Sequence, residues 1–380
     1  MPFSGRSKKL MLNKKRVLFI THDTSLYGAS RSLQTLIRNL RDVEVDLVIR
    51  RRFFRKNDLE QVRSFFGSNV RSIHEFHLPF DPSYIGKNAS KLILKLTKML
   101  WLKDAASIYH FIKSNDYDYI HLNSLVLHDI INSDFKFIIH IRDIFDGSNL
   151  KAIKSLEMAA GVIYIDEATE KPFRNLPLKN SIVLNNPFDM QHLSAINIEE
   201  IYTKVKIQGG KTIFSIIGKV VKIKGVDLVI KAFKQVINKD AILLVVGDGG
   251  DKHFLNYCKD LAKEDSRIEF YGEEPNIENV YLVSDYILRA DPQFCIGRTI
   301  YEGLYAGCHV IMPGDEADKE KIFEIEKFSD KISVYTPGSV AAMAKVLQLK
   351  ASVKITNRAF DSNVAAYINK FSNFINKSIY

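Results

Sequence analysis

The chain has 380 residues, of which 46% are apolar and 26% charged. This composition is typical of a globular protein of two or three domains, and it excludes a disordered chain and a coiled coil. The three cysteines are too few for a disulfide framework or a four-thiolate zinc site, which favours a reducing compartment. No apolar run reaches the ~20 residues of a membrane span. The basic N-terminus lacks the apolar core of a signal peptide, so we expect a protein that is soluble or lies on a membrane surface.

The net charge of +10 is concentrated at one end of the chain. Residues 1–100 hold 20 Lys and Arg against 8 Asp and Glu, a balance of +12, and the rest of the chain has a balance of −2. A basic N-terminal quarter indicates an anionic partner, such as phospholipid, nucleic acid or a phosphorylated substrate.

The N-terminal half alternates short apolar runs with helical patterns. Residues 16–21 form a continuous apolar run, which is typical of a strand buried on both faces, and a loop with Gly28 and a helical pattern over 30–40 follow. Further strands are predicted at 45–49, 119–122, 137–140, 162–165 and 182–184. This alternation favours a mostly parallel sheet with helices on both faces.

The pattern stops over residues 186–210, which we interpret as a linker, and then starts again. Strands are predicted at 212–217, 241–246, 268–271, 286–288 and 310–312, with a helix over 226–236 and an amphipathic helix at the end of the chain. The sequence therefore predicts an α/β protein of two similar open-sheet domains. Ligands of such domains gather at the carboxyl ends of the strands.

The stretch 291–307 follows a predicted strand and opens a helix near Arg298. Behind Gly297, the free N–H groups and the positive dipole end of this helix are suited to a phosphate. Glu302 lies one turn inside, where a carboxylate can accept hydrogen bonds from the vicinal hydroxyls of a ribose. The alternative is a surface ion pair, because Arg298 and Glu302 are four residues apart.

A basic turn from Gly218 to Gly225 lies between a predicted strand and a predicted helix. Phosphate sites are commonly built at such turns, and two lysines there can neutralise a diphosphate leaving group without a metal ion. The alternative is a solvated basic turn with no ligand.

These motifs resemble family 4 of the retaining, nucleotide-sugar-dependent glycosyltransferases, which have the GT-B fold. The resemblance covers nearly the whole chain and is strongest from about 212 to 313. It rests on the loop at 27–30, on His140 at the end of an apolar run, on the turn at 218–225 and on the stretch 297–302. The stretches 246–249 and 185–187 also match in kind and place.

The sequence departs from the family pattern at two positions. Lys219 stands where the family has an arginine, so the charge is kept but the bidentate fork is lost. Phe294 stands where the first glutamate of the paired-glutamate motif, which touches the transferred sugar, is expected. Asp291, three residues earlier, is a possible substitute. Otherwise the donor sugar is unusual or the activity is reduced.

The resemblance implies a GT-B protein of two Rossmann-like domains facing a cleft. Residues 1–190 would bind the acceptor, residues 191–354 would bind the nucleotide-sugar, and residues 355–380 would return to the N-terminal domain. The residues that the resemblance places at the site fall into three groups: His140, Lys219 and Lys224 with catalytic roles; Gly28, Gly218, Gly297, Arg298, Thr299 and Glu302 at the donor; Asp291 and Phe294 as possible sugar contacts. No metal and no cofactor beyond the donor are expected. A structural role within the fold is the alternative for His140.

The basic N-terminal quarter contains a candidate membrane or acceptor surface. Over residues 87–103 lysines recur on one helical face and apolar residues on another, which suits an anionic membrane surface. The residues assigned to this surface are Arg51, Arg52, Lys91, Lys95, Lys98 and Trp101. The alternative is a core-facing helix with a solvated lysine face. Nucleic acid fits less well, since no nucleic-acid-binding module matches.

We therefore expect a cytoplasmic glycosyltransferase at the inner face of the membrane. It would move a sugar from a nucleoside diphosphate-sugar to a lipid-linked saccharide in bacterial lipopolysaccharide or capsule synthesis. Two alternatives stay open, a non-catalytic sugar-nucleotide-binding protein and a GT-B epimerase, although the carboxylate set of an epimerase is not found. A dinucleotide oxidoreductase is disfavoured, because no G-x-G-x-x-G follows the first strand.

Overall fold

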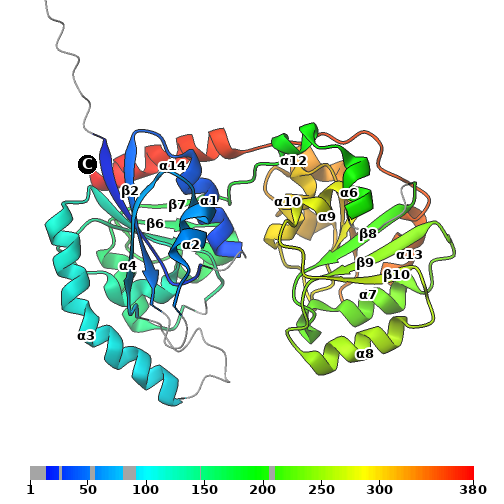
Figure 1. Cartoon of the computed structure of the whole chain (residues 1–380), viewed down its shortest axis with the longest axis horizontal. Coiled ribbons are helices and arrows are strands. Elements are labelled where there is room, and N and C mark those ends of the chain that lie inside the picture. The colour runs from blue at the N-terminus through cyan, green and yellow to red at the C-terminus, as the bar shows by residue number, and fades with distance from the viewer. Residues whose placement is uncertain (1–13, 25–27, 52–55, 80–90, 146, 205–209) are drawn as a thin grey trace, which may run out of the picture. The chain divides into compact units, whose positions relative to one another are not determined.

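The protein is described by a computed structural model that covers residues 14–24, 28–51, 56–79, 91–145, 147–204 and 210–380. It forms two compact units, each built around one parallel sheet (Figure 1). Unit 1 runs to Pro187 and resumes at Val364, and unit 2 comprises Phe188–Asn363. Residues 355–363, which the sequence groups with the terminal helix, belong to unit 2. None of the described helices has an apolar stretch of the length that crossing a membrane requires.

Unit 1 contains a seven-stranded sheet of order β3-β2-β1-β4-β5-β6-β7, with every pair parallel. Its strands are β1 (Lys15–Thr21), β2 (Val43–Arg50), β3 (Val70–Phe76), β4 (Tyr119–Leu122), β5 (Phe137–Ile141), β6 (Gly161–Tyr164) and β7 (Ser181–Val183). The apolar runs become the central strands because parallel strands are buried on both faces.

Helices cover both faces of this sheet. One face packs against α1 (Gly28–Asn39), α2 (Leu59–Phe66) and α14 (Val364–Ile379). The other packs against α3 (Lys91–Asn115), the 3-10 helix η2 (Leu125–Ile130) and α4 (Leu150–Met158). The terminal helix α14, red in Figure 1, lies beside α1 at the start of the chain.

Unit 2 contains a six-stranded parallel sheet of order β10-β9-β8-β11-β12-β13. Its strands are β8 (Thr212–Ile217), β9 (Ala241–Val246), β10 (Ile268–Gly272), β11 (Tyr286–Leu288), β12 (His309–Pro313) and β13 (Ile332–Tyr335). One face packs against α7 (Val226–Phe233), α8 (Lys252–Ala262) and α13 (Val340–Lys350). The other packs against α6 (Ile198–Lys204), α9 (Glu278–Val283) and α10 (Arg298–Tyr305).

These sheets confirm the predicted fold class of two parallel α/β domains. The interpretation of 186–210 as a linker is wrong for much of that stretch. Phe188, Leu193 and Tyr202 are buried in the core of unit 2, and the stretch forms the 3-10 helix η4 (Gln191–Ala195) and α6. Apolar side chains at irregular spacing supply this packing, so no strong periodicity marks it in the sequence.

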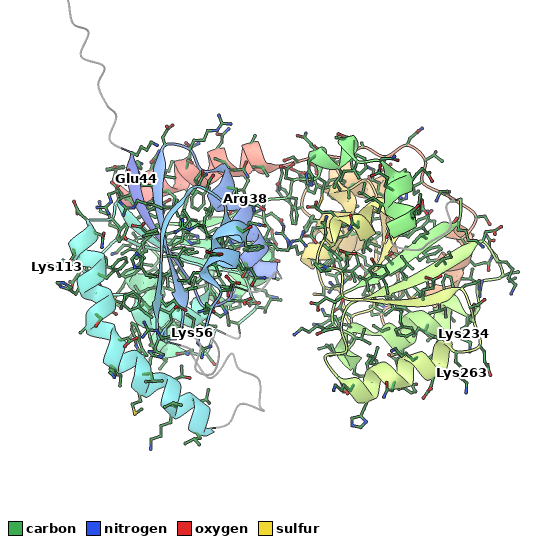
Figure 2. The ribbon with its side chains drawn as sticks, in the orientation of Figure 1. Arg38, Glu44, Lys56, Lys113, Lys234 and Lys263 are labelled. Carbon is green, nitrogen blue, oxygen red and sulfur yellow. The ribbon has the colours of Figure 1, made fainter. Side chains whose placement is uncertain are left out.

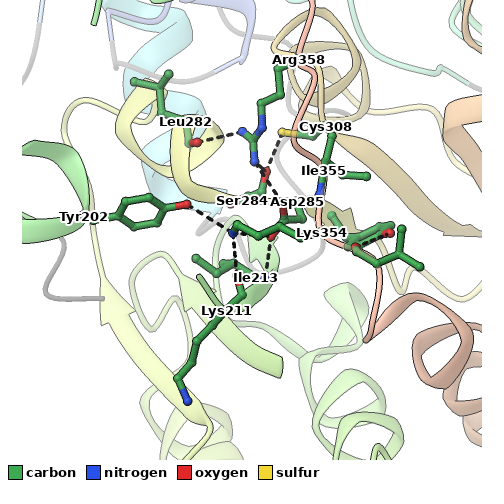
Figure 3. Close-up of polar contacts among 12 residues, drawn as sticks. Tyr202, Lys211, Ile213, Leu282, Ser284, Asp285, Cys308, Lys354, Ile355 and Arg358 are labelled. Atoms are coloured by element: carbon green, nitrogen blue, oxygen red, sulfur yellow. Dashed lines mark hydrogen bonds and ion pairs between the residues drawn. The ribbon is translucent and has the colours of Figure 1, made fainter. Parts of the chain in front are cut away.

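Asp285, at the start of β11, ties the end of unit 2 to its sheet (Figure 3). Its buried carboxylate accepts hydrogen bonds from the backbone N–H groups of Ile213, at 2.8 Å, and Ile355, at 2.9 Å. The ammonium of Lys354 and the guanidinium of Arg358 each lie 3.5 Å from it. The segment between α13 and α14 is therefore held by a buried charge with several partners.

Replacing Asp285 by Asn should lower the free energy of unfolding of unit 2 by about 3 kcal/mol, because it removes the buried anion of two partly buried cations. Urea unfolding measures this change. The matched control is Asp240→Asn, at a mostly exposed carboxylate paired with Lys211, which should change the value by less than about 0.5 kcal/mol. Equal effects of the two variants would contradict this assignment.

Candidate active site

The basic turn of unit 2 lies at the carboxyl edge of its sheet, at the point where the strand order reverses between β8 and β11. The turn is tied to the loop after β9, since Gly218 donates to the carbonyl of Val246 and Val220 to that of Asp248. Gly225 has φ +65°, and a Cβ there would lie 2.1 Å from the carbonyl oxygen of Ala290. Only glycine allows this approach, which presses the turn against the residues that follow β11.

A small pocket lies where the turn meets the segment after β11, and both lysines of the prediction line it. Its lining includes Gly218, Lys219, Lys224, Arg289 and Asp291. The ammonium of Lys224 lies 3.0 Å from Asp291 Oδ1. Arg289 lies against the other oxygen of this carboxylate, with Nε at 2.7 Å and Nη2 at 2.6 Å. Asp291 is therefore shared by two cations, and the pocket keeps an excess of positive charge.

The first turn of α10 lies next to this group. Arg289 Nη1 donates to Thr299 Oγ1 at 3.1 Å, and a Cβ on Gly297 would lie 2.5 Å from the same nitrogen. Gly297 is the N-cap residue and supplies no side-chain cap to the helix. The positive end of the α10 dipole thus lies beside the cationic pocket, which is an arrangement suited to an anion.

Glu302 is buried within α10, at 1% exposure. It accepts a hydrogen bond from Arg298 Nε at 2.7 Å and another from the hydroxyl of Tyr281 at 2.6 Å. The Arg298 guanidinium also lies 4.9 Å from the ring centroid of Phe188. The ion pair between Arg298 and Glu302, which the sequence analysis gave as an alternative, therefore exists, but it is largely buried and does not lie on the surface. Each oxygen of the Glu302 carboxylate therefore accepts a hydrogen bond within unit 2.

The two possible sugar contacts have other neighbours in the structure. Phe294 is partly buried against the core of unit 2, with the ammonium of Lys321 5.5 Å from its ring centroid. Asp291 is engaged by Lys224 and Arg289. The contact of either residue with a sugar stays a prediction.

In unit 1, the predicted site residues lie at the carboxyl edge of the sheet. Gly28 is the first residue of α1, with φ +31°. His140 is the next-to-last residue of β5 and is fully buried, and its Nδ1 lies 3.2 Å from Arg142 Nη2. Arg142 also donates to Asn123 Oδ1 and to Asn186 Oδ1, both at 2.7 Å.

Sequence reasoning missed Arg142, Arg289 and Tyr281. The available signal was a basic residue directly after a predicted strand for Arg142 and Arg289. No local pattern points to Tyr281, because it meets Glu302 only through tertiary packing.

A second histidine, His121 of β4, lies next to His140, with 5.5 Å between the ring centroids. Burial, and then the charge of Arg142, hold the pKa values of both rings well below the usual histidine value. Within the described part of the chain, neither nitrogen of His121 has a hydrogen-bond partner, nor does His140 Nε2. Both rings are therefore neutral, and because Arg142 donates to Nδ1, the proton of His140 lies on Nε2.

The predicted membrane surface is only partly exposed. Lys95 and Lys98 of α3 are exposed, as are Leu92 at 75%, Met99 at 58% and Leu102 at 64%. Trp101 does not belong to this surface: it is 6% exposed and packs edge-on against Tyr109 in the core of unit 1.

The other three basic residues assigned to the membrane surface are Arg51, Arg52 and Lys91. Arg51 donates to the carbonyl of Glu75 at 2.9 Å. Arg52 lies outside the described residues, and Lys91 is described only as the first residue of α3.

Comparison with known proteins gives one family match. Residues 197–315 match the model of the family described as "Glycosyl transferases group 1". No curated protein sequence matches the chain significantly.

Several solved structures share the fold over nearly their whole length. Anabaena Alr3699/HepE in complex with UDP has a TM-score of 0.70 at 16% identity, covering 95% of this chain and 99% of that one. A glycosyltransferase from Rickettsia africae has a TM-score of 0.67 at 16% identity, covering 97% and 96%. WaaG, a glycosyltransferase involved in lipopolysaccharide biosynthesis, has a TM-score of 0.58 at 13% identity, covering 96% and 94%. The chain thus has the GT-B fold, and residues 197–315 carry the signature of the group 1 glycosyltransferases.

The buried histidines predict an acid-sensitive unit 1. The folded state keeps His121 and His140 neutral, whereas the unfolded chain binds protons below about pH 6.5, so stability falls as the pH falls below that value. Each histidine should contribute a slope of about 1.4 kcal/mol per pH unit in that range. His121→Phe should reduce the slope by one proton in urea unfolding between pH 7.5 and 5. An unchanged slope in His121→Phe would contradict the assignment.

Proposed function

We propose that this protein is a retaining glycosyltransferase that moves a sugar from a nucleoside diphosphate-sugar to a saccharide acceptor. The observation that carries the proposal is the pocket at the strand-order reversal of unit 2. There Lys219 and Lys224 line the pocket together with Arg289, which donates to Thr299 in the first turn of α10, and a buried glutamate follows one turn inside that helix. The family match over residues 197–315 covers these elements and supports the proposal.

The chemistry needs negative charge to be stabilised as it develops on the leaving group. As the bond from the anomeric carbon to the diphosphate oxygen breaks, Lys219, Lys224 and the N–H groups of α10 stabilise the diphosphate. As the acceptor oxygen bonds to the same carbon, its hydroxyl proton passes to the departing diphosphate oxygen, which leaves as the protonated nucleoside diphosphate. The pocket holds three cationic side chains and one carboxylate, a net charge of +2, which matches a diphosphate and needs no cofactor beyond the donor.

Other roles are supported by the resemblance alone. These are retention of configuration, binding of the ribose by Glu302, and the catalytic role of His140, whose ring is buried within unit 1 in this structure. WaaG is involved in lipopolysaccharide biosynthesis, which supports that pathway for this protein. Another surface polysaccharide and a lipid-linked acceptor rest on the resemblance alone. The UDP and UDP-glucose complexes of HepE make uridine diphosphate the first nucleotide to test.

Thermal shift with UDP, GDP, ADP and CDP tests donor binding. One of them, at 100 times its Kd, should stabilise the protein by about 2.7 kcal/mol. Lys219→Met should weaken that binding about tenfold, because it removes a charge-assisted contact to phosphate. Lys219 is exposed and forms no ion pair with the described residues, so the variant should fold normally. Lys263→Met, at the end of α8 (Figure 2), is the matched control and should bind as the wild type does.

Failure of all four nucleotides to stabilise the wild type would contradict the glycosyltransferase proposal. Binding without release of nucleoside diphosphate from the corresponding sugar donors would favour the alternative, a non-catalytic sugar-nucleotide-binding protein. Phe294, in the place of the first motif glutamate, is the residue that supports this alternative.

We also propose that unit 1 works at an anionic membrane surface, through the exposed face of α3. The apolar side chains of Leu92, Met99 and Leu102 are exposed to water. Moving each of them from water into the membrane would gain about 1.5–3 kcal/mol. The adjacent Lys95, Lys98 and Lys103 are exposed, and each would gain about 1 kcal/mol near anionic lipid.

Vesicle flotation tests this membrane proposal. The protein should float with vesicles of phosphatidylcholine and phosphatidylglycerol in equal parts, and not with phosphatidylcholine alone. Both Met99→Ser/Leu102→Ser and Lys95→Glu/Lys98→Glu should reduce flotation at least about fivefold, whereas the charge-matched Lys234→Glu/Lys263→Glu in unit 2 (Figure 2) should not. Flotation unaffected by the α3 variants would contradict the proposal.

A further inference from the structure

The carboxylate of Asp291 competes with any bound diphosphate for the ammonium of Lys224. This ammonium lies 3.0 Å from Asp291 Oδ1, and Asp291 is only 6% exposed. A buried carboxylate at the edge of a diphosphate site has two adverse effects, because it holds the lysine and repels the ligand. The site works only if the charge of Asp291 is neutralised by another group.

Arg289 is placed to neutralise it. Its backbone is fixed on both sides, since its N–H donates to the carbonyl of Ile311 at 2.9 Å and its carbonyl accepts from the Tyr335 hydroxyl at 2.9 Å. Its side chain is 9% exposed and directs two nitrogens at Asp291 Oδ2, the oxygen that Lys224 does not contact. The third nitrogen donates to Thr299, which fixes the plane of the guanidinium.

We infer that Arg289 is a positioning residue that sets the affinity of the pocket for diphosphate. It binds the carboxylate of Asp291 and so leaves the Lys224 ammonium available to the ligand, without itself contacting the donor. The inference rests on the proposed function of the same site. It assigns the control of donor affinity to a side chain that the sequence pattern does not mark.

The charges determine what each substitution does. In Arg289→Met, Asp291 keeps Lys224 as its sole cation, so that the lysine is held away from the ligand and the carboxylate repels it. In Asp291→Asn the competitor is neutral, and Lys224 stays available. In the double variant Arg289→Met/Asp291→Asn, both the competitor and its neutralising partner are gone, so Lys224 becomes available again.

Isothermal titration with UDP, GDP, ADP, CDP and the four monophosphates tests this inference. Arg289→Met should weaken binding of the preferred diphosphate about tenfold or more and that of its monophosphate less than about threefold. Asp291→Asn should bind within about threefold of the wild type, and the double variant should regain wild-type affinity to within the same factor. If Arg289 had only a structural role, the further substitution Asp291→Asn would not restore the affinity for diphosphate.

Arg267→Met is the matched control. Arg267 also directs two nitrogens at one carboxylate, that of Asp265, with Nε 2.8 Å from Oδ1 and Nη2 2.6 Å from Oδ2, and its side chain is similarly buried in unit 2. This variant should lose comparable stability and keep the wild-type affinity for diphosphate.

Three results would count against these claims, and they are distinguishable. A wild type that binds no diphosphate overturns the proposed function and this inference with it. Binding by the wild type with no loss in Arg289→Met overturns the inference alone. A double variant as weak as Arg289→Met also overturns it, because Arg289 would then contact the ligand directly or serve only the fold.

Discussion

The candidate site of unit 2 depends on the carboxylate of Asp291, which lies between two cations from different segments. Lys224 comes from the turn after β8, and Arg289 follows β11. The contact requires the turn to lie directly on the segment after β11, and the absence of a side chain at Gly225 makes this possible. Through Arg289 and Thr299 the same charge network reaches α10. One buried charge thus connects the three segments from which the pocket is built.

Both units place a guanidinium directly after a central strand. Arg142 follows β5 in unit 1, and Arg289 follows β11 in unit 2. Each is nearly buried and donates to several side chains, which include neutral amides around Arg142 and a carboxylate beside Arg289. In open parallel sheets this edge collects the ends of strands and the starts of helices, so polar networks form where ligands bind. Buried networks of this kind gain rigidity only when their members are satisfied.

The central strands were predictable because each is a continuous apolar run buried on both faces. The edge strands β3 and β13 were missed, because their residues are mostly half-buried and polar residues interrupt the apolar pattern. Lys219, Lys224 and Glu302 lie at the elements that the motifs predicted. Tyr281 and Arg289 could not be assigned from the sequence, since tertiary packing alone brings them to Glu302 and Asp291. Trp101 shows the opposite failure: a basic amphipathic pattern marks the helix but does not say which of its side chains face the core.

We propose that the carboxyl edge of unit 2 holds a nucleoside diphosphate between the turn 218–225 and α10. A crystal structure of the protein with the nucleoside diphosphate that it prefers tests this most directly. We expect the diphosphate within hydrogen-bond distance of the ammonium groups of Lys219 and Lys224 and of the first N–H groups of α10, with Asp291 still bound by Arg289. A diphosphate bound elsewhere on the protein, or one that displaces Arg289 from Asp291, would contradict it.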